Sequence, residues 1–126
     1  MIKGIGIDTV DISRIERLIN KYKHHFFEKV FTPGEIQYCN KMAKPAVHFA
    51  GRWAVKEAFY KALPLSCQKN STWKSIELMT PDKGGPVIKI CSGLLNEHMK
   101  KEKITKFHVS MSHEQKYCVA VVVLEE

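Results

Sequence analysis

Two carboxylates that lie far apart in the chain, Asp8 and Glu57, are the residues best suited to chemistry. Asp8 closes a short alternating run near the N-terminus, and Glu57 sits within an apolar segment. Two carboxylates that meet in a fold can work as an acid–base pair or can bind a hard cation. Mg²⁺ is typically held by one or two carboxylates, while waters and substrate phosphates complete its shell. The pair therefore predicts either acid–base chemistry or a metal site.

Basic residues close to Glu57 favour the metal site. Arg52, Lys56 and Lys61 all lie within a turn or two of it along a helix. They suit a multiply charged phosphate ligand, whereas a glycosidase, which also uses paired carboxylates, would not need them. We therefore expect Asp8 and Glu57 to form one magnesium site for the transfer of a phosphate-bearing group, with Lys61 one turn beyond Glu57.

The segment that carries Glu57, Ala46 to Leu63, predicts a buried helix. It is rich in helix formers, has no interior proline and is apolar on nearly every side. Glu57 shares one face with Lys61 and with the small residues Ala50, Ala54 and Ala58. A buried charge must be paired or coordinated. A simple ion pair between Glu57 and Lys61 is the alternative, but it explains an exposed helix better than one this apolar.

The run from Ile2 to Asp8 predicts the strand that positions the first carboxylate. Its alternation puts Ile5 and Ile7 on one face, and Gly4, Gly6 and Asp8 on the other. Two glycines on one face weaken a strand unless something approaches the backbone there. The pattern leaves two interpretations open, which are close packing against a helix and a ligand beside Asp8.

A basic amphipathic helix is predicted after this strand. Ser13 and Glu16 have the spacing of a capping box. Ile15, Leu18, Ile19 and Tyr22 then recur on one face. The opposite face carries Arg14, Arg17 and Lys21. A solvated face is the ordinary interpretation of such a pattern.

The remaining elements predict an α+β fold, with helices early and strands late. A helix capped by Thr32 and Glu35 is expected to end near Lys44 and Pro45. A turn at 81–86 predicts a hairpin. The remaining predicted elements are strands at Trp73–Met79, Val87–Cys91, Phe107–Ser112 and Tyr117–Leu124, and a helix at Leu94–Lys101. The length of 126 residues argues for one domain over residues 1–126.

Two further segments are weaker candidates for ligand binding. The turn Lys83-Gly84-Gly85-Pro86 could offer backbone N–H groups and a lysine to a phosphate, although the pattern alone favours a plain hairpin turn. His108, Ser110 and Ser112 form a polar strand face that the pattern alone describes as solvated. There is no P-loop, nucleophile elbow or complete dinucleotide-binding motif.

Composition narrows the class of protein only moderately. With 44% hydrophobic and 26% charged residues the chain is an ordinary globular sequence. A net charge of +7 attracts acidic partners and anionic ligands. The four cysteines show no zinc spacing and favour a reduced, cytoplasmic compartment. The N-terminus lacks the pattern of a signal peptide, and no apolar run is long enough to span a bilayer.

The motifs, in order along the chain, resemble those of the holo-acyl-carrier-protein synthases, the short, single-domain 4'-phosphopantetheinyl transferases. The N-terminal match is Gly4-Ile5-Gly6-Ile7-Asp8 with Val10, Arg14 and Ile15, followed by Phe31-Thr32-Pro33-Gly34-Glu35. The most specific match joins Asp8 to the block Ala50-Gly51-Arg52-Trp53-Ala54-Val55-Lys56-Glu57-Ala58 with Lys61-Ala62. His108-Val109-Ser110-Met111-Ser112-His113 completes a resemblance that covers essentially the whole chain.

The resemblance implies a fold, an activity and partners. The implied fold is that of these transferases, a mainly antiparallel sheet packed against a long buried helix. Such enzymes move phosphopantetheine from coenzyme A to a serine of apo acyl carrier protein and release adenosine 3',5'-bisphosphate. By analogy, Asp8 and Glu57 hold Mg²⁺ on the pyrophosphate, and Lys61 contacts phosphate. Members assemble as homotrimers, and the first helix, here with Arg14, Arg17 and Lys21, docks the acidic carrier protein.

By the same resemblance, coenzyme A lies at subunit interfaces. The neighbouring subunit is expected to contribute Arg52, the turn Lys83-Gly84-Gly85-Pro86 and His108, and Ser110 is a further candidate for binding coenzyme A. One departure concerns the end of the long helix, where Pro64 stands in place of a glycine that many members have. Because proline enforces a stop that glycine does not, no ligand contact is assigned to the loop after Pro64.

Two rival functions use the same residues differently. The +7 charge is compatible with a small nucleic-acid-binding module, but no nucleic-acid-binding signature appears. A coenzyme A-binding protein without catalysis is the other rival, and the intact acids Asp8 and Glu57 argue against it. The sequence therefore favours the enzyme, with neither nucleic acid nor membrane as a partner. It does not say which carrier protein is used.

Overall fold

A computed structural model describes residues 1–126. The strands are β1 (Ile2–Asp11), β2 (Ile76–Met79), β3 (Val87–Ile90), β4 (Lys106–His113) and β5 (Tyr117–Glu125). The helices are α1 (Ile12–Tyr22), α2 (His24–Val30), α3 (Pro33–Asn40), α4 (Pro45–Ala62), α5 (Leu65–Gln68) and α6 (Gly93–Lys101), with a 3₁₀ turn η1 at Trp73–Ser75. No helix is long and apolar enough to cross a membrane.

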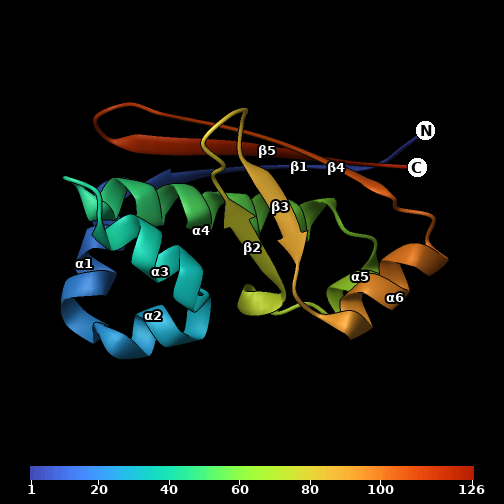
Figure 1. Ribbon diagram of the computed structural model, residues 1–126, viewed down its shortest axis with the longest axis horizontal. Coiled ribbons are helices and arrows are strands. Elements are labelled where there is room, and N and C mark those ends of the chain that lie inside the picture. The colour runs from blue at the N-terminus through green and yellow to red at the C-terminus, as the bar shows by residue number, and fades with distance from the viewer.

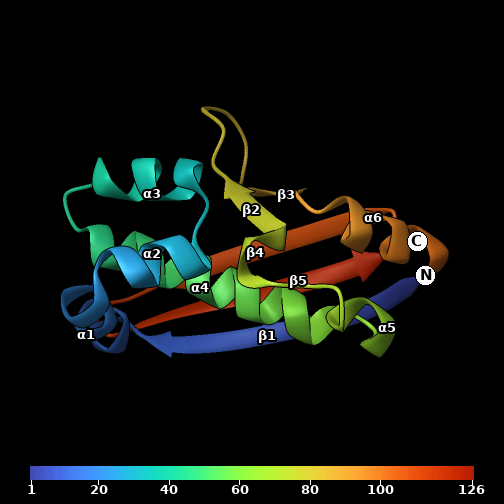
Figure 2. The ribbon, with the colours of Figure 1, turned by 90° about the horizontal axis from the view of Figure 1, so that it is seen from below.

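A three-stranded antiparallel sheet of order β1–β5–β4 lies along one side of the 18-residue helix α4 (Figure 1). The strands β2 and β3 form a separate antiparallel hairpin. Helices α1, α2 and α3 gather near the start of α4, whereas α5 and α6 lie near its end (Figure 2). The predicted α+β fold, with antiparallel sheets and a long buried helix, is confirmed.

The glycines of β1 explain how the sheet and α4 meet. A Cβ added at Gly6 would collide with the carbonyl oxygen of Ala58, and one added at Gly4 with that of Ala62. The close-packing interpretation of this face is therefore correct, since both glycines face the backbone of α4. The same register turns Asp8 toward α4, because strand residues alternate between the two faces of a sheet.

The opposite face of the sheet is apolar and uncovered in the single chain. Ile5 and Ile7 of β1 are 63% and 60% exposed. Their partners on β5 are Val123 and Val121, which are only partly buried. The main core lies on the other side, where β5 residues pack with α4 and a cluster of aromatic rings that includes Phe31, Phe49 and Phe59.

Several local predictions are confirmed, and others are wrong. Thr32 and Glu35 form the predicted reciprocal capping box at the start of α3. The predicted capping box at Ser13 is absent, because Asp11 caps α1 and accepts a hydrogen bond from the backbone N–H of Ser13. The predicted strand from Trp73 begins only at Ile76, and helix α2 was not predicted.

Candidate functional site

Asp8 and Lys61 meet where β1 crosses the end of α4. The Lys61 ammonium lies 3.0 Å from Oδ1 of Asp8 and donates a second hydrogen bond to the Ile7 carbonyl, at 3.1 Å. The Asp8 side chain is only 14% exposed, whereas that of Lys61 is 51% exposed. Because this pair is open to solvent on the lysine side, the ammonium is free to move toward an anionic ligand.

Glu57 lies one turn before Lys61 on α4 and is half-buried. Burial raises the pKa of its carboxyl group, and the charge of Asp8 raises that pKa further. Lys61 and Arg14 lower it in turn. The structure thus brings Asp8, Glu57 and Lys61 together, and the two carboxylates are close enough to repel each other.

The arrangement has the donor set that a magnesium ion needs from a protein. Two neighbouring carboxylates repel each other, and a divalent cation between them would relieve that repulsion. No third histidine, cysteine or acid joins them. Mg²⁺ keeps several waters and commonly binds through one or two carboxylates and substrate phosphates, so two acids are sufficient.

A cavity of about 480 Å³ opens beside Glu57. The α4 side of its wall is formed by Glu57, Phe59 and Tyr60 with the stem of Lys56, and Lys29 of α2 also lines it. The remaining wall is the segment 71–76, which contributes Ser71, Thr72, Trp73 and Ile76. Glu57 therefore borders a hollow that is part polar and part apolar, whereas Asp8 does not line it.

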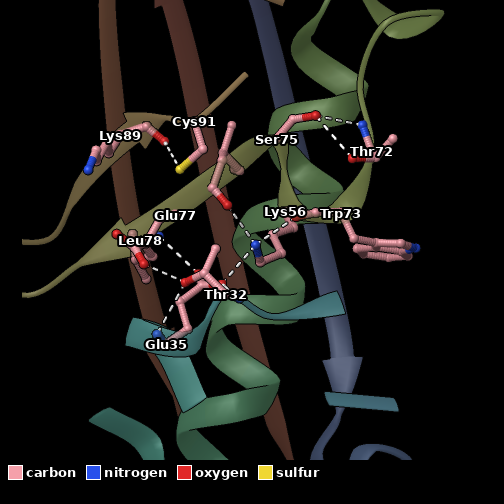
Figure 3. A network of polar contacts seen from close by, with 11 residues as sticks. Thr32, Glu35, Lys56, Thr72, Trp73, Ser75, Glu77, Leu78, Lys89 and Cys91 are labelled. Carbon is pink, nitrogen blue, oxygen red and sulfur yellow. Dashed lines mark hydrogen bonds and ion pairs between the residues drawn. The ribbon is translucent and has the colours of Figure 1, made fainter. Parts of the chain in front are cut away.

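Lys56 does not belong to the site, contrary to the expectation that it serves a phosphate. Its ammonium is buried, pairs with Glu35 at 2.9 Å and donates to the carbonyls of Trp73 and Ile76, both at 2.7 Å (Figure 3). All three of its protons are thereby used. The sequence pattern could not reveal this, because every partner comes from a distant segment.

Arg52 is held by different partners from those of the acid pair. It is 3% exposed, its guanidinium lies 4.2 Å from the centre of the Tyr38 ring, and Nη2 donates to Oγ1 of Thr80 at 3.0 Å. Its Nε has no hydrogen-bond partner. Arg52 is thus fixed between α3 and the end of β2, and the single chain does not bring it to Asp8.

The turn Lys83-Gly84-Gly85-Pro86 joins β2 to β3 and is largely exposed. Gly84 has a φ of 89°, a left-handed conformation that favours glycine. Nothing lies within 4 Å of a Cβ added at Gly84 or Gly85. The turn therefore offers an open backbone and touches none of the acid-pair residues within this chain.

His108 and Ser110 lie on the apolar outer face of the sheet. His108 is opposite Val123 and Ser110 is opposite Val121, so both share the face of Ile5 and Ile7. The His108 ring contacts Oε1 of Glu125 at 2.9 Å. Within one chain these two candidates are therefore on the side of the sheet away from α4, and Asp8 is on the other.

Two tryptophans near the acid pair were not identified as site residues from the sequence. The rings of Trp53 and Trp73 pack against each other with centroids 4.4 Å apart and a tilt of 31°, and the guanidinium of Arg14, which was predicted only as a docking residue, lies 5.7 Å from the centre of the Trp53 ring. The sequence could have indicated that Trp53 lies near Glu57, because it is one turn before Glu57 on α4. It could not have placed Trp73, which lies in an irregular segment.

The chain matches the family described as the 4'-phosphopantetheinyl transferase superfamily over residues 4–122. A holo-[acyl-carrier-protein] synthase of Syntrophus aciditrophicus is 43% identical over 125 residues, which are 99% of this chain and 97% of that one. A protein of the same name from Thermodesulfovibrio yellowstonii is 42% identical, over 98% of this chain and 99% of that one.

Solved structures of such synthases share the fold. That of Neisseria meningitidis superposes with a TM-score of 0.86 at 30% identity and full coverage of both chains. That of Helicobacter pylori, in complex with coenzyme A, has a TM-score of 0.78 at 31% identity over 96% of this chain and 99% of that one. The chain therefore belongs to the 4'-phosphopantetheinyl transferase superfamily and, within it, to the holo-[acyl-carrier-protein] synthases.

Proposed function

We propose that this enzyme transfers the 4'-phosphopantetheine group of coenzyme A to a serine of an apo acyl carrier protein. The reaction depends on Mg²⁺ and releases adenosine 3',5'-bisphosphate. The observation that carries the proposal is the meeting of Asp8, Glu57 and Lys61, with a cavity beside Glu57, in a family whose Helicobacter pylori member binds coenzyme A.

Each of these three residues has a role in the transfer. The serine oxygen bonds to the phosphorus that carries pantetheine. The bond from that phosphorus to the bridging oxygen breaks, and its electron pair leaves on that oxygen with adenosine 3',5'-bisphosphate. Glu57, the acid that lines the cavity, accepts the serine proton. Lys61 leaves Asp8 for the pyrophosphate oxygens and neutralises their charge.

Asp8 and Glu57 are the proposed holders of Mg²⁺. When bound, the ion would neutralise charge on the pyrophosphate and on the departing phosphate. Asp8 suits this role because it is mostly buried and rigidly placed by the packing of Gly4 and Gly6 on α4. Since metal and lysine supply the neutralisation, no protein nucleophile is needed.

The active site is proposed to be shared between subunits of a homotrimer. The exposed Ile5 and Ile7 give the outer face of the sheet the apolar character of an interface. His108 and Ser110 lie on that same face, so a neighbour that covers it would meet them. We assign them, with Arg52 and the turn 83–86, to coenzyme A bound between two subunits.

Helix α1 is the proposed docking surface for the acidic carrier protein. Arg14, Arg17 and Lys21 are exposed on it. Arg14 also lies over Trp53 and acts on the pKa of Glu57, which links the docking surface to the acid pair. A groove of about 480 Å³ continues this surface between α1 and α2, where it is lined by Leu18, Tyr22, Phe26 and Trp53 among others.

A cytoplasmic location and a single domain are also proposed, on features that are less specific than the site residues. All four cysteines are free, which suits a reduced, cytoplasmic setting. The 25 buried apolar residues form one core cluster, which supports a single domain over residues 1–126.

The mass of an apo carrier protein incubated with the enzyme, coenzyme A and Mg²⁺ tests the proposal. We expect the mass to increase by one phosphopantetheine group, and the increase to disappear with a chelator and return with added Mg²⁺. A panel of apo carrier proteins covers partner preference. If none of them gains mass, while the protein binds DNA or RNA in a salt-sensitive way, the proposal is wrong and a nucleic-acid-binding role is favoured.

A further inference from the structure

A buried ion pair between Glu35 and Lys56 joins three segments that are distant in the sequence (Figure 3). Their side chains are 0% and 2% exposed, and their charged atoms are 2.9 Å apart. Glu35 belongs to α3 and Lys56 to α4, while the carbonyls that Lys56 binds belong to Trp73 and Ile76. The pair therefore sits where α3, α4 and the start of β2 meet.

All three ammonium protons of Lys56 and both carboxylate oxygens of Glu35 bond to protein groups. Oε1 of Glu35 accepts from the Thr32 N–H at 2.9 Å and from Lys56, and Oε2 accepts from the Leu78 N–H at 2.9 Å. Thr32 in turn donates its hydroxyl to Glu77 of β2. A fully satisfied buried network rigidifies the groups that it joins.

The segment held by Lys56 is the wall of the cavity beside Glu57. Trp73 and Ile76 both line that cavity, and Lys56 binds the carbonyls of these same two residues. This wall has little regular structure. Before β2 begins at Ile76, its only regular element is the short 3₁₀ turn η1. Two charge-assisted hydrogen bonds from one ammonium therefore tie an irregular segment to the helix that carries Glu57.

The wall also continues toward the basic helix α1. Trp73 packs against Trp53 of α4, and Arg14 of α1 lies over the Trp53 ring. A shift of the Trp73 backbone would therefore disturb both the cavity and the tryptophan pair. Because Lys56 directly precedes Glu57 on α4, the same turn of helix anchors the wall and presents the acid.

We infer that Lys56, oriented by Glu35, is a positioning residue that fixes the Trp73–Ile76 wall of the cavity beside Glu57 and thereby sets the affinity of the site for coenzyme A. The inference rests on the proposed function for the identity of the substrate. Lys56 touches no reacting atom, so its effect falls on substrate binding and leaves the chemical step nearly unchanged.

The charge-neutral double variant Glu35→Gln/Lys56→Met tests this inference, with Lys74→Met as the matched control. Removing both charges avoids an unpaired buried ion, and Lys74 is an exposed lysine of the same segment that makes no side-chain contact. We expect the double variant to raise KM for coenzyme A at least tenfold while kcat at saturation changes less than threefold. Lys74→Met should leave both constants unchanged.

The two tryptophans provide a second readout that does not depend on activity. They are the only tryptophans in the chain, and their ring centroids are 4.4 Å apart, so their near-ultraviolet circular dichroism reports on the wall. We expect the double variant to lose the signal of the packed pair at a temperature where its far-ultraviolet spectrum is that of a folded protein. If the double variant does not fold, Glu35→Gln/Lys56→Gln, which keeps a donor for one carbonyl, replaces it, with smaller changes in the same directions.

The outcomes separate this inference from the proposed function. A normal KM and an unchanged tryptophan signal, with only a lower melting temperature, would show that the pair merely stabilises the fold. A loss of kcat at constant KM would assign Lys56 to the reacting groups and overturn the positioning role. If the wild-type enzyme itself transfers nothing, the proposed function fails, and the tryptophan signal alone then decides whether Lys56 holds the wall.

Discussion

Helix α4 carries two ion pairs that differ in almost every physical respect. Lys56 and Glu35 are both buried, and all three protons of Lys56 and both oxygens of Glu35 bond to protein groups. The Lys61 side chain is half-exposed, so its ammonium contacts both Asp8 and solvent. A saturated pair can only hold structure, whereas an open pair can exchange its partner for a ligand. The comparison supports the proposal that two lysines of one helix, a turn or so apart, have different roles, with Lys56 holding structure and Lys61 taking part in the transfer.

The largest expected effect is on transfer by variants of the two acids. Asp8→Asn and Glu57→Gln should each lower the rate of phosphopantetheine transfer by roughly a thousandfold or more, because each removes a charge from the proposed metal site. The initial rate of carrier-protein modification measures this. Melting temperatures near that of the wild type would show that the fold survives, and near-normal turnover in either variant would contradict the metal assignment.

The next effect concerns stability at the saturated pair. Lys56→Met should lower the free energy of unfolding by about 3–5 kcal/mol, because it leaves the Glu35 carboxylate buried without its cation. Urea denaturation followed by far-ultraviolet circular dichroism measures the change. In the charge-neutral Glu35→Gln/Lys56→Met variant, a large part of the loss should be restored. A loss below about 1 kcal/mol in the single variant would mean that the pair is not buried as described.

The open pair should give the opposite result. Lys61→Met should change the free energy of unfolding by less than about 1 kcal/mol, since the lysine is half-exposed. It should nevertheless lower transfer by about a hundredfold, because a charge opposite the pyrophosphate is lost. Lys69→Met, at an exposed lysine beyond the end of α4, is the control for the loss of one positive charge. If Lys61→Met destabilised the protein as strongly as Lys56→Met, the distinction between the two pairs would fail.

The smallest effect is the pH dependence of stability at Glu57. Burial, and then Asp8, raise the pKa of this carboxyl group above 4.5, its ordinary value. The folded state therefore keeps the proton longer than the unfolded state does, and the stabilisation present below pH 4.5 is lost as pH rises through the raised pKa. Without metal, the stability of the wild type relative to Glu57→Gln should fall with pH across that window. Parallel curves for the two proteins would contradict the shift.

Sequence patterns predicted the elements that carry Asp8, Glu57 and Lys61 better than they predicted the surroundings of these residues. Regular alternation placed Asp8 on the glycine face of β1, and strong helix formers placed Glu57 and Lys61 on α4. The role of Lys56 was predicted wrongly, because a helix pattern shows which residues share a face but not which distant group meets them. Helix α2, at His24–Val30, was not predicted because its adjacent phenylalanines do not recur with the period of a helix.

The Asx-type cap of α1 shows a similar limit. Both Asp11 and Ser13 are good helix-capping residues, and the choice between them depends on where β1 ends. The strand continues to Asp11, beyond the predicted end at Asp8, so Asp11 is the residue at the boundary. The alternation of residues likewise predicted that Ile5 and Ile7 share a face of the sheet. It could not predict what covers that face, because the sequence of one chain does not identify a partner.

The most direct test of the central claim is Mn²⁺ binding, as a spectroscopic substitute for Mg²⁺, followed by electron paramagnetic resonance in the presence of coenzyme A. The wild type should bind one ion per active site, and Lys56→Met, if folded, should bind it as well. Asp8→Asn and Glu57→Gln should each lose that binding. Undiminished Mn²⁺ binding in both acid variants would contradict the proposal that these two carboxylates form one metal site.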